Sequence, residues 1–204
     1  MKFGCLMDEF RSRMDDASPP YRWSDESVAE FINDSYRDAC ERANLIERET
    51  SVSFSAGDWR RNINPAIYDI RSARIGDMPL SRADRHIIPR RSGLPDLFFH
   101  GLNSLEISPT PIVSTTVTLQ VYRLPTILLN KTDDLEIDDV NREGIIFGAL
   151  ARAFSMNDPD TGDLSRAALF DAKFTVFFGP SKSRNALRQQ REKSSPTVKF
   201  NYQW

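Results

Sequence analysis

The spacing of apolar side chains changes twice along this chain, and these changes constrain its fold more than any other feature. Between Trp23 and Leu45 apolar residues recur at steps of three and four, the period of an amphipathic helix. From about residue 50 to residue 129 the apolar segments become short and β-rich, mostly separated by Gly, Pro or Asn. The helical period returns at Ile137. We therefore expect an α+β protein with a β-rich central insertion.

The helical segments are predicted to form a small antiparallel bundle. They should span about residues 3–15, 24–45, 138–156 and 163–178. Ser24 and Asp163 are the expected caps of the second and fourth helices, because their side chains accept hydrogen bonds from first-turn amides. The fourth helix should turn one apolar stripe to the core: Leu164, Ala167, Phe170, Phe174 and Phe177.

The β-rich insertion, about residues 50–129, is predicted to form a small sheet. Near its end Val117, Leu119 and Val121 alternate with polar side chains, so one face of this strand should meet a core. Residues 1–180 are predicted to form one domain, and residues 181–204 to lie outside it as a basic linker and an extended C-terminal docking arm.

Composition excludes several classes of function. The net charge of −2 gives no global attraction to nucleic acid or to an anionic membrane. Apolar runs are shorter than the roughly 20 residues that cross a bilayer, so we expect synthesis in a cytoplasm and no membrane partner. Cys5 and Cys40 lie in predicted helices without a CxxC spacing, which favours two buried thiols over a disulfide or a metal pair.

The sequence offers little for catalysis. His86 and His100 are the only histidines, and no HExxH, Walker A, GxGxxG or GxSxG pattern is present. We interpret both histidines as surface or loop residues and expect no catalytic residue, metal or cofactor. The acidic run from Asp133 to Asp139 lacks the glycine and glutamate spacing of an EF-hand, which favours a solvated linker that also caps the next helix.

The segment after residue 180 is strongly basic. Between Ser181 and Lys193 five cations face one acid, Glu192, a net charge of +4. Only Ala186 and Leu187 in this segment are apolar, and burial of so small a surface cannot offset the entropy lost on ordering. We therefore expect a solvated extension or a helix that forms against a partner. Its basic residues are Lys182, Arg184, Arg188, Arg191 and Lys193.

The last residues alternate strictly between apolar and polar side chains, the pattern of a strand with one buried face. The apolar members are Val198, Phe200, Tyr202 and Trp204. This strand could return to its own sheet and cover the core. We favour docking on another molecule, because the basic run gives the strand reach and because Tyr and Trp often dominate interface energies.

Four segments, in this order, resemble the head-to-tail adaptor (connector) proteins of tailed bacteriophages, a group that includes podovirus tail accessory or head-completion proteins. They are the helix WSDESVAEFINDSYRDACERANLI, the middle segment GLPDLFFHGLNSLEISPTP, the strand closing VYRLP, and the helical pair IIFGALARAFSMNDPDTGDLSRAALFDAKFTVFF. The resemblance covers about Trp23 to Phe178 and includes no catalytic residue.

The resemblance implies a structural virion protein at the head–tail junction. Such adaptors form rings, commonly twelvefold, beneath the portal; their helices surround the DNA exit channel and their β-rich part faces the tail tube, nozzle or tail-hub protein added next. It further implies portal docking by the four alternating residues, and contacts of the five basic residues with acidic portal surface or with genomic DNA.

Two other interpretations remain open. A small virion-associated enzyme, such as a cell-wall hydrolase, would have to use scattered carboxylates, of which Glu136 and Asp138 are candidates. A DNA-binding accessory protein would use the basic segment and nearby aromatic residues.

Overall fold

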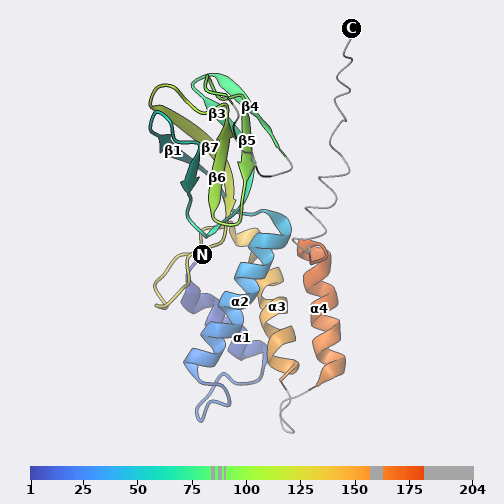
Figure 1. Ribbon diagram of the computed structural model, residues 1–204. Helices are drawn as coiled ribbons and strands as arrows, with labels where there is room; N and C mark the ends of the chain where they lie inside the picture. The colour runs from blue at the N-terminus through green and yellow to red at the C-terminus, as the bar shows by residue number, and fades with distance from the viewer. Residues whose placement is uncertain (84–85, 87–88, 90, 157–162, 182–204) are drawn as a thin grey trace. The chain divides into compact units, whose positions relative to one another are not determined.

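The computed structural model describes residues 1–83, 86, 89, 91–156 and 163–181. Within these residues the chain forms four α-helices, a short 3-10 helix and a seven-stranded sheet, which confirms the α+β class (Figure 1). The described residues divide into two compact units. A helical unit comprises Met1–Arg48, Ala66–Tyr68 and Tyr122–Ser181, and a sheet unit comprises Glu49–Pro65 and Asp69–Val121.

The helical unit is built on α3, which packs against both α2 and α4, while α1 packs against α2 and α3. Its elements are α1 (Phe3–Arg13), α2 (Asp25–Ala43), the 3-10 helix η1 (Asp139–Asn141), α3 (Arg142–Phe154) and α4 (Leu164–Phe178). Small residues let three helices approach closely. A Cβ at Gly148 of α3 would lie 2.7 Å from a ring carbon of Phe174 on α4 and would clash with Ser35 Oγ on α2.

The helix boundaries follow local side-chain chemistry. Ser24 Oγ accepts a hydrogen bond from the Ser27 amide at 3.1 Å, and α2 ends where Asn44 adopts a left-handed conformation with φ of 54°. Asp163 Oδ1 accepts from the amides of Ser165 and Arg166, each at 3.0 Å. Both predicted N-caps are thus confirmed.

The sheet unit contains most of seven strands in the order β1-β7-β3-β4-β5-β6-β2. The strands are β1 (Glu47–Phe54), β2 (Arg60–Asn62), β3 (Ile67–Ile75), β4 (Met78–Arg82), β5 (Leu97–His100), β6 (Ser104–Ser108) and β7 (Thr115–Arg123). β4 pairs in parallel with β5, whereas β3–β4, β5–β6 and β2–β6 are antiparallel pairs. On β7 the residues Val117, Leu119 and Val121 are buried between less buried neighbours, as the alternation predicted.

Two expectations about burial are confirmed only in part. Cys40 is buried, but Cys5 is exposed because the core-facing positions of α1 are Phe3, Leu6, Met7 and Phe10. On α4 the predicted stripe is rotated. Ala167, Phe174 and Phe178 are buried, whereas Leu164 and Phe177 are 77% and 45% exposed.

Candidate interaction surfaces

The residues that the sequence singled out for docking lie outside the described residues. They are the apolar Val198, Phe200, Tyr202 and Trp204 and the basic Lys182, Arg184, Arg188, Arg191 and Lys193. Their roles stay predictions, and so does the boundary of the domain near residue 180.

The two histidines and the two candidate carboxylates belong to different units. His86 and His100 belong to the sheet unit, where His86 is exposed with Nδ1 3.0 Å from the buried Glu106 carboxylate. His86 thus lies at the surface, as the prediction of surface or loop residues allowed, whereas His100 is half-buried at the end of β5. Glu136 and Asp138 belong to the helical unit. Across the part of the chain that the structure describes, no group of three or more His, Cys, Asp or Glu residues could hold a metal ion.

Carboxylates of the acidic run have separate local partners. Asp133 Oδ2 accepts from the amides of Leu129 and Asn130, each at 2.8 Å, and these bonds lower the pKa of Asp133. The hydrogen bond from Lys2 at 2.6 Å likewise lowers the pKa of Asp134. The capping prediction for this run is wrong, because neither Asp138 before η1 nor Asn141 before α3 makes a side-chain cap.

Glu136 is hydrogen-bonded to residues that precede it in the chain, Arg123 and Thr126. Its carboxylate pairs with the Arg123 guanidinium and accepts from the Thr126 amide at 3.0 Å. Partial burial opposes ionisation, but the hydrogen bonds from Arg123 and Thr126 outweigh it and lower the pKa of Glu136. The Glu136 carboxylate thus links Arg123 to the backbone of Thr126.

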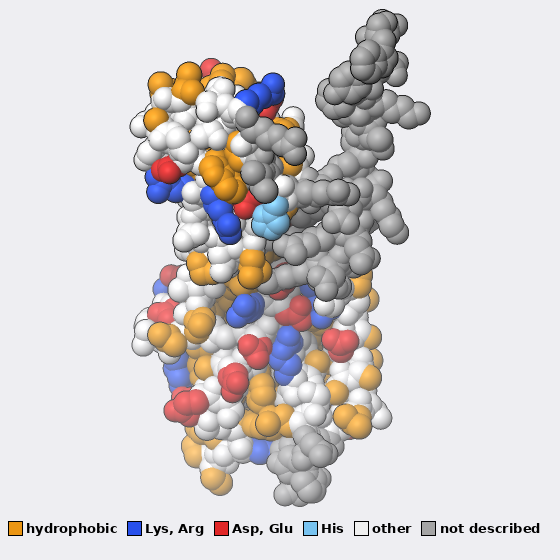
Figure 2. Space-filling model, in the orientation of Figure 1, with side chains coloured by type: hydrophobic (Ala, Val, Ile, Leu, Met, Phe, Trp, Pro, Cys, Tyr) orange, Lys and Arg blue, Asp and Glu red, His pale blue; other side chains and the backbone are white. Residues whose placement is uncertain are grey.

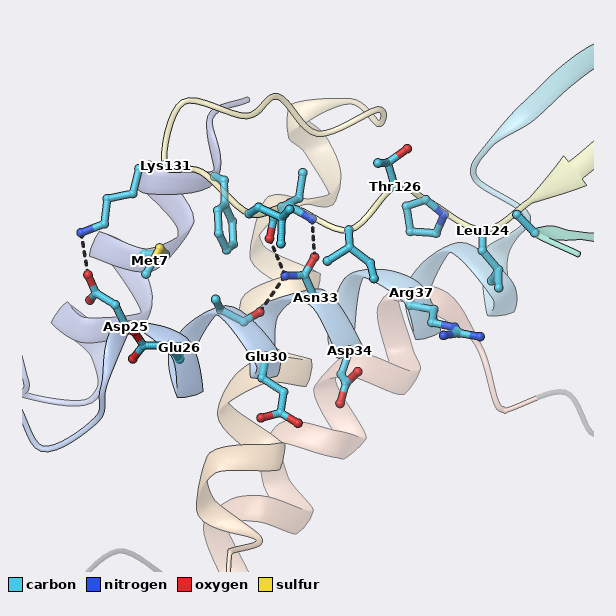
Figure 3. A pocket seen from close by; sticks show the side chains of 17 residues that line it. Met7, Asp25, Glu26, Glu30, Asn33, Asp34, Arg37, Leu124, Thr126 and Lys131 are labelled. Carbon is cyan, nitrogen blue, oxygen red and sulfur yellow. Dashed lines mark hydrogen bonds and ion pairs between the residues drawn. The ribbon is translucent and has the colours of Figure 1, made fainter. Parts of the chain in front are cut away.

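A cleft of ≈ 720 Å³ lies between α2 and an extended stretch, residues 124–131, hereafter the 124–131 segment (Figure 3). Its floor is apolar and includes Phe3 and Met7 of α1, Ala29 of α2 and Leu128. We call this site the α2 cleft. All its lining residues belong to the helical unit.

Asn33 positions the wall of the α2 cleft. Its Nδ2 donates to the carbonyl oxygens of Ala29 and Leu128, each at 2.9 Å, while its Oδ1 accepts from the Leu128 amide at 2.8 Å (Figure 3). One side chain thus satisfies both backbone groups of Leu128 and holds the segment as a strand-like wall without a sheet. Leu128 is buried, whereas Ile127 and Leu129 on either side of it are exposed.

The rim of the α2 cleft is acidic. Four carboxylates and two cations line it, a net charge of −2. Asp25 lies 3.0 Å from Lys131 and 2.7 Å from Arg11, and their hydrogen bonds lower the pKa of Asp25. Glu30 and Asp34 make no ion pair with any residue in the described ranges, and in the view of Figure 3 both side chains extend from the side of α2 away from the 124–131 segment.

The outer face of α4 is a second candidate surface. Leu169 and Val176 are 54% and 85% exposed. Because residues three or four positions apart lie on the same face of a helix, both align with Ala172. Ala168 and Leu164 are exposed beside them. Figure 2 shows hydrophobic side chains along the edge of the helical unit that α4 occupies. We call these five residues the α4 outer face.

Exposed apolar surfaces of this kind suit contacts with other proteins. A family model described as SU10 adaptor protein matches residues 1–199. The chain therefore belongs to the SU10 adaptor family of bacteriophage adaptor proteins, which confirms the predicted resemblance and indicates a structural role in the virion. No curated protein matches the chain. Within the described residues, no helix is long and apolar enough to span a membrane.

Neither the α2 cleft nor the α4 outer face was predicted from the sequence. A signal for each was present: Ile127, Leu128 and Leu129 form an apolar triplet after the last strand, and α4 has Leu169 and Val176 on the side opposite its core stripe. The family match includes Val198 but ends before Phe200, Tyr202 and Trp204.

Proposed function

We propose that this chain is the subunit of a head-to-tail adaptor ring that binds the portal, continues the DNA exit channel and provides the platform for tail attachment. The observation that carries the proposal is the family match over residues 1–199. In this proposal the four helices act as a compact antiparallel bundle that forms the body of the ring, commonly of twelve copies, around the channel.

Docking on the portal is assigned to the alternating residues 198–204. Main-chain amides of an extended segment can add to a foreign sheet or line a groove while alternate side chains fill pockets. Phe200, Tyr202 and Trp204 supply the large rigid side chains that dominate such contacts. The five basic residues between Lys182 and Lys193 would contact acidic portal surface or the phosphates of DNA in the channel.

The sheet unit is proposed to meet the tail tube, nozzle or tail-hub protein. The support for this proposal is a group of exposed apolar side chains on two neighbouring loops. The Gly93 amide donates to the Thr110 carbonyl at 2.9 Å, which brings two loops together, and these loops carry the exposed Leu94, Ile112 and Val113. Exposed apolar residues on two neighbouring loops fit a protein contact.

Deletion of residues 197–204 tests the docking. The truncated protein should lose binding to purified portal, while its circular dichroism spectrum and melting temperature stay those of the full chain. Trp204→Ala should weaken portal binding by about thirtyfold or more, because truncation of a central interface aromatic costs about 2 kcal/mol or more. Val113→Ala, in the sheet unit, is the matched control and should leave portal affinity unchanged.

The same proteins separate the two alternatives. If the chain were a DNA-binding accessory protein, truncated and full chains would bind DNA equally, with affinity that falls steeply as salt rises. If it were a cell-wall hydrolase, the purified protein would clear peptidoglycan, and Glu136→Gln would abolish the clearing. Unchanged portal binding by the truncated protein contradicts the proposed docking.

A further inference from the structure

Both surfaces of the helical unit are apolar without a partner among the described residues. Besides its buried stripe, α4 has a second set of apolar side chains on its exposed outer face. The α2 cleft has an apolar floor, and the exposed Ile127 and Leu129 extend it outwards. Apolar surface gathered in this way marks an interaction site.

The two surfaces occupy opposite edges of the helical unit. Arg42 of α2 donates to Thr175 Oγ1 and to the Gly179 carbonyl at the end of α4, at 3.4 and 3.3 Å. The cleft is lined instead by the other side of α2, by α1 and by the 124–131 segment, and by no residue of α4. Figure 1 shows α4 at one edge of this unit and the 124–131 segment at the other.

Shape and charge are complementary between these edges. The α4 outer face is convex, as the side of any helix is, whereas the α2 cleft is concave. The charged residues of α4 flank the outer face: Arg166 pairs with Asp163 at 3.4 Å, and Lys173 Nζ lies over the rings of Phe147 and Phe170. With Asp171 they give the helix a net charge of +1, against the −2 of the cleft. Glu30 and Asp34 on the rim are available for cations of another chain.

We propose that the α4 outer face of one copy lies in the α2 cleft of the next copy. Two different surfaces on opposite sides of a subunit make a heterologous contact, which repeats from copy to copy and closes into a ring when the rotation allows it. Closure into a ring rests on the proposed function, whereas the contact between copies is inferred from the two surfaces. A portal or tail segment in the cleft is the competing outcome.

Cysteine cross-linking tests the contact. In a Cys5→Ser background, which removes the exposed native thiol, Val176→Cys on α4 is combined with Ile127→Cys on the cleft wall. Oxidation of the assembled double variant should give a ladder of covalent dimers, trimers and larger species. Each single variant should give none, because a heterologous contact does not bring a residue next to its own copy. Ile112→Cys with Val176→Cys is the control pair and should give no ladder.

The outcomes distinguish this contact from the proposed function. Assembly without a ladder, or dimers from Val176→Cys alone, overturns the contact. Cross-linking of the cleft cysteine to portal or tail protein does the same and identifies the competing occupant. A ladder from protein that fails to bind portal supports the contact and contradicts the proposed function. Absence of both a ladder and any assembly contradicts both.

Charge reversal gives a second readout on the intact subunit. Glu30→Lys should shift the protein from the assembled species to the free subunit in sedimentation, and Lys173→Glu should do the same. The two changes together should restore the assembled species, because they exchange the charges across the contact. If the double variant loses as much assembly as the two single variants do together, the two surfaces do not pair.

Discussion

At the residue scale, a buried ion pair joins Arg11 of α1 to Asp16 in the loop that leads to α2. Arg11 and Asp16 are 6% and 5% exposed; Nη1 of Arg11 lies 2.6 Å from Asp16 Oδ2, and its Nη2 donates to the Trp23 carbonyl at 2.9 Å. Asp16 also accepts from the amide of Arg22 at 2.6 Å. These bonds fix the turn that leads into α2.

Arg11→Met should lower the free energy of unfolding by about 3–5 kcal/mol, because it leaves the Asp16 carboxylate buried without its charge partner. Urea unfolding followed by circular dichroism measures the change. Arg13→Met is the matched control. Arg13 pairs with Glu9 one turn away on the surface of α1, so its loss should cost at most about 1 kcal/mol. Equal losses for the two variants would contradict the importance of burial.

The limits of sequence reading are also set by single residues. The caps of α2 and α4 were predictable because Ser24 and Asp163 act on amides two or three residues away. The role of Asn33 was not, because its partner Leu128 is 95 residues distant. Nothing in a local pattern reveals that a polar residue within a helix holds the wall of a cleft.

At the scale of elements, the spacing of apolar residues predicted the long helices and strands but not the short strands. α2 and β7 have enough residues for a period to be recognised, and both form where expected. β2 has three residues, Arg-Arg-Asn, without an apolar member, and β4 contains Pro79. Both form through pairing with neighbours, which local propensity does not encode. For α4 the predicted stripe included the buried Ala167 and Phe174, but packing turned Phe178 rather than Phe177 to the core.

The 124–131 segment provides a pH-dependent test. The pKa of Glu136 is lowered in the folded protein, so the unfolded chain takes up the proton first as pH falls. The stability from Glu136 is thus fully present above its ordinary pKa of about 4.5 and is lost as pH drops through the lower folded value. Glu136→Gln should destabilise the protein at pH 7 and should flatten the fall of unfolding free energy below pH 4.5, measured by urea titration.

A matched control is Glu143→Gln at the start of α3, where the side chain is 57% exposed. This variant should retain the acid dependence of the full-length wild-type chain. A Glu136→Gln protein as stable as wild type at pH 7, with an unchanged acid slope, would show that Arg123 and Thr126 do not depend on this carboxylate.

At the scale of the whole molecule, three strands join the two units covalently. Among the described residues, three boundaries between the units fall within β1, β3 and β7, so each of these strands has consecutive residues in both units, and a fourth lies between Pro65 and Ala66. The ends in the helical unit are hydrogen-bonded there: the Arg123 amide donates to the Ile46 carbonyl at 3.2 Å, and Tyr68 OH donates to the Cys40 carbonyl at 2.9 Å. Since loss of these bonds frees the adjoining strand residues, unfolding of one unit should destabilise the other.

The chain supplies a probe for each unit, Trp23 in the helical unit and Trp59 in the sheet unit. In a Trp204→Phe background, variants that retain one of these tryptophans should give coincident urea transitions, as a two-state protein does. Ile145→Ala, which truncates a side chain with no exposed surface in the helical core, should destabilise by about 2–5 kcal/mol and should move both transitions together. If only the Trp23 transition moves, the strands do not couple the units, and each unit unfolds on its own.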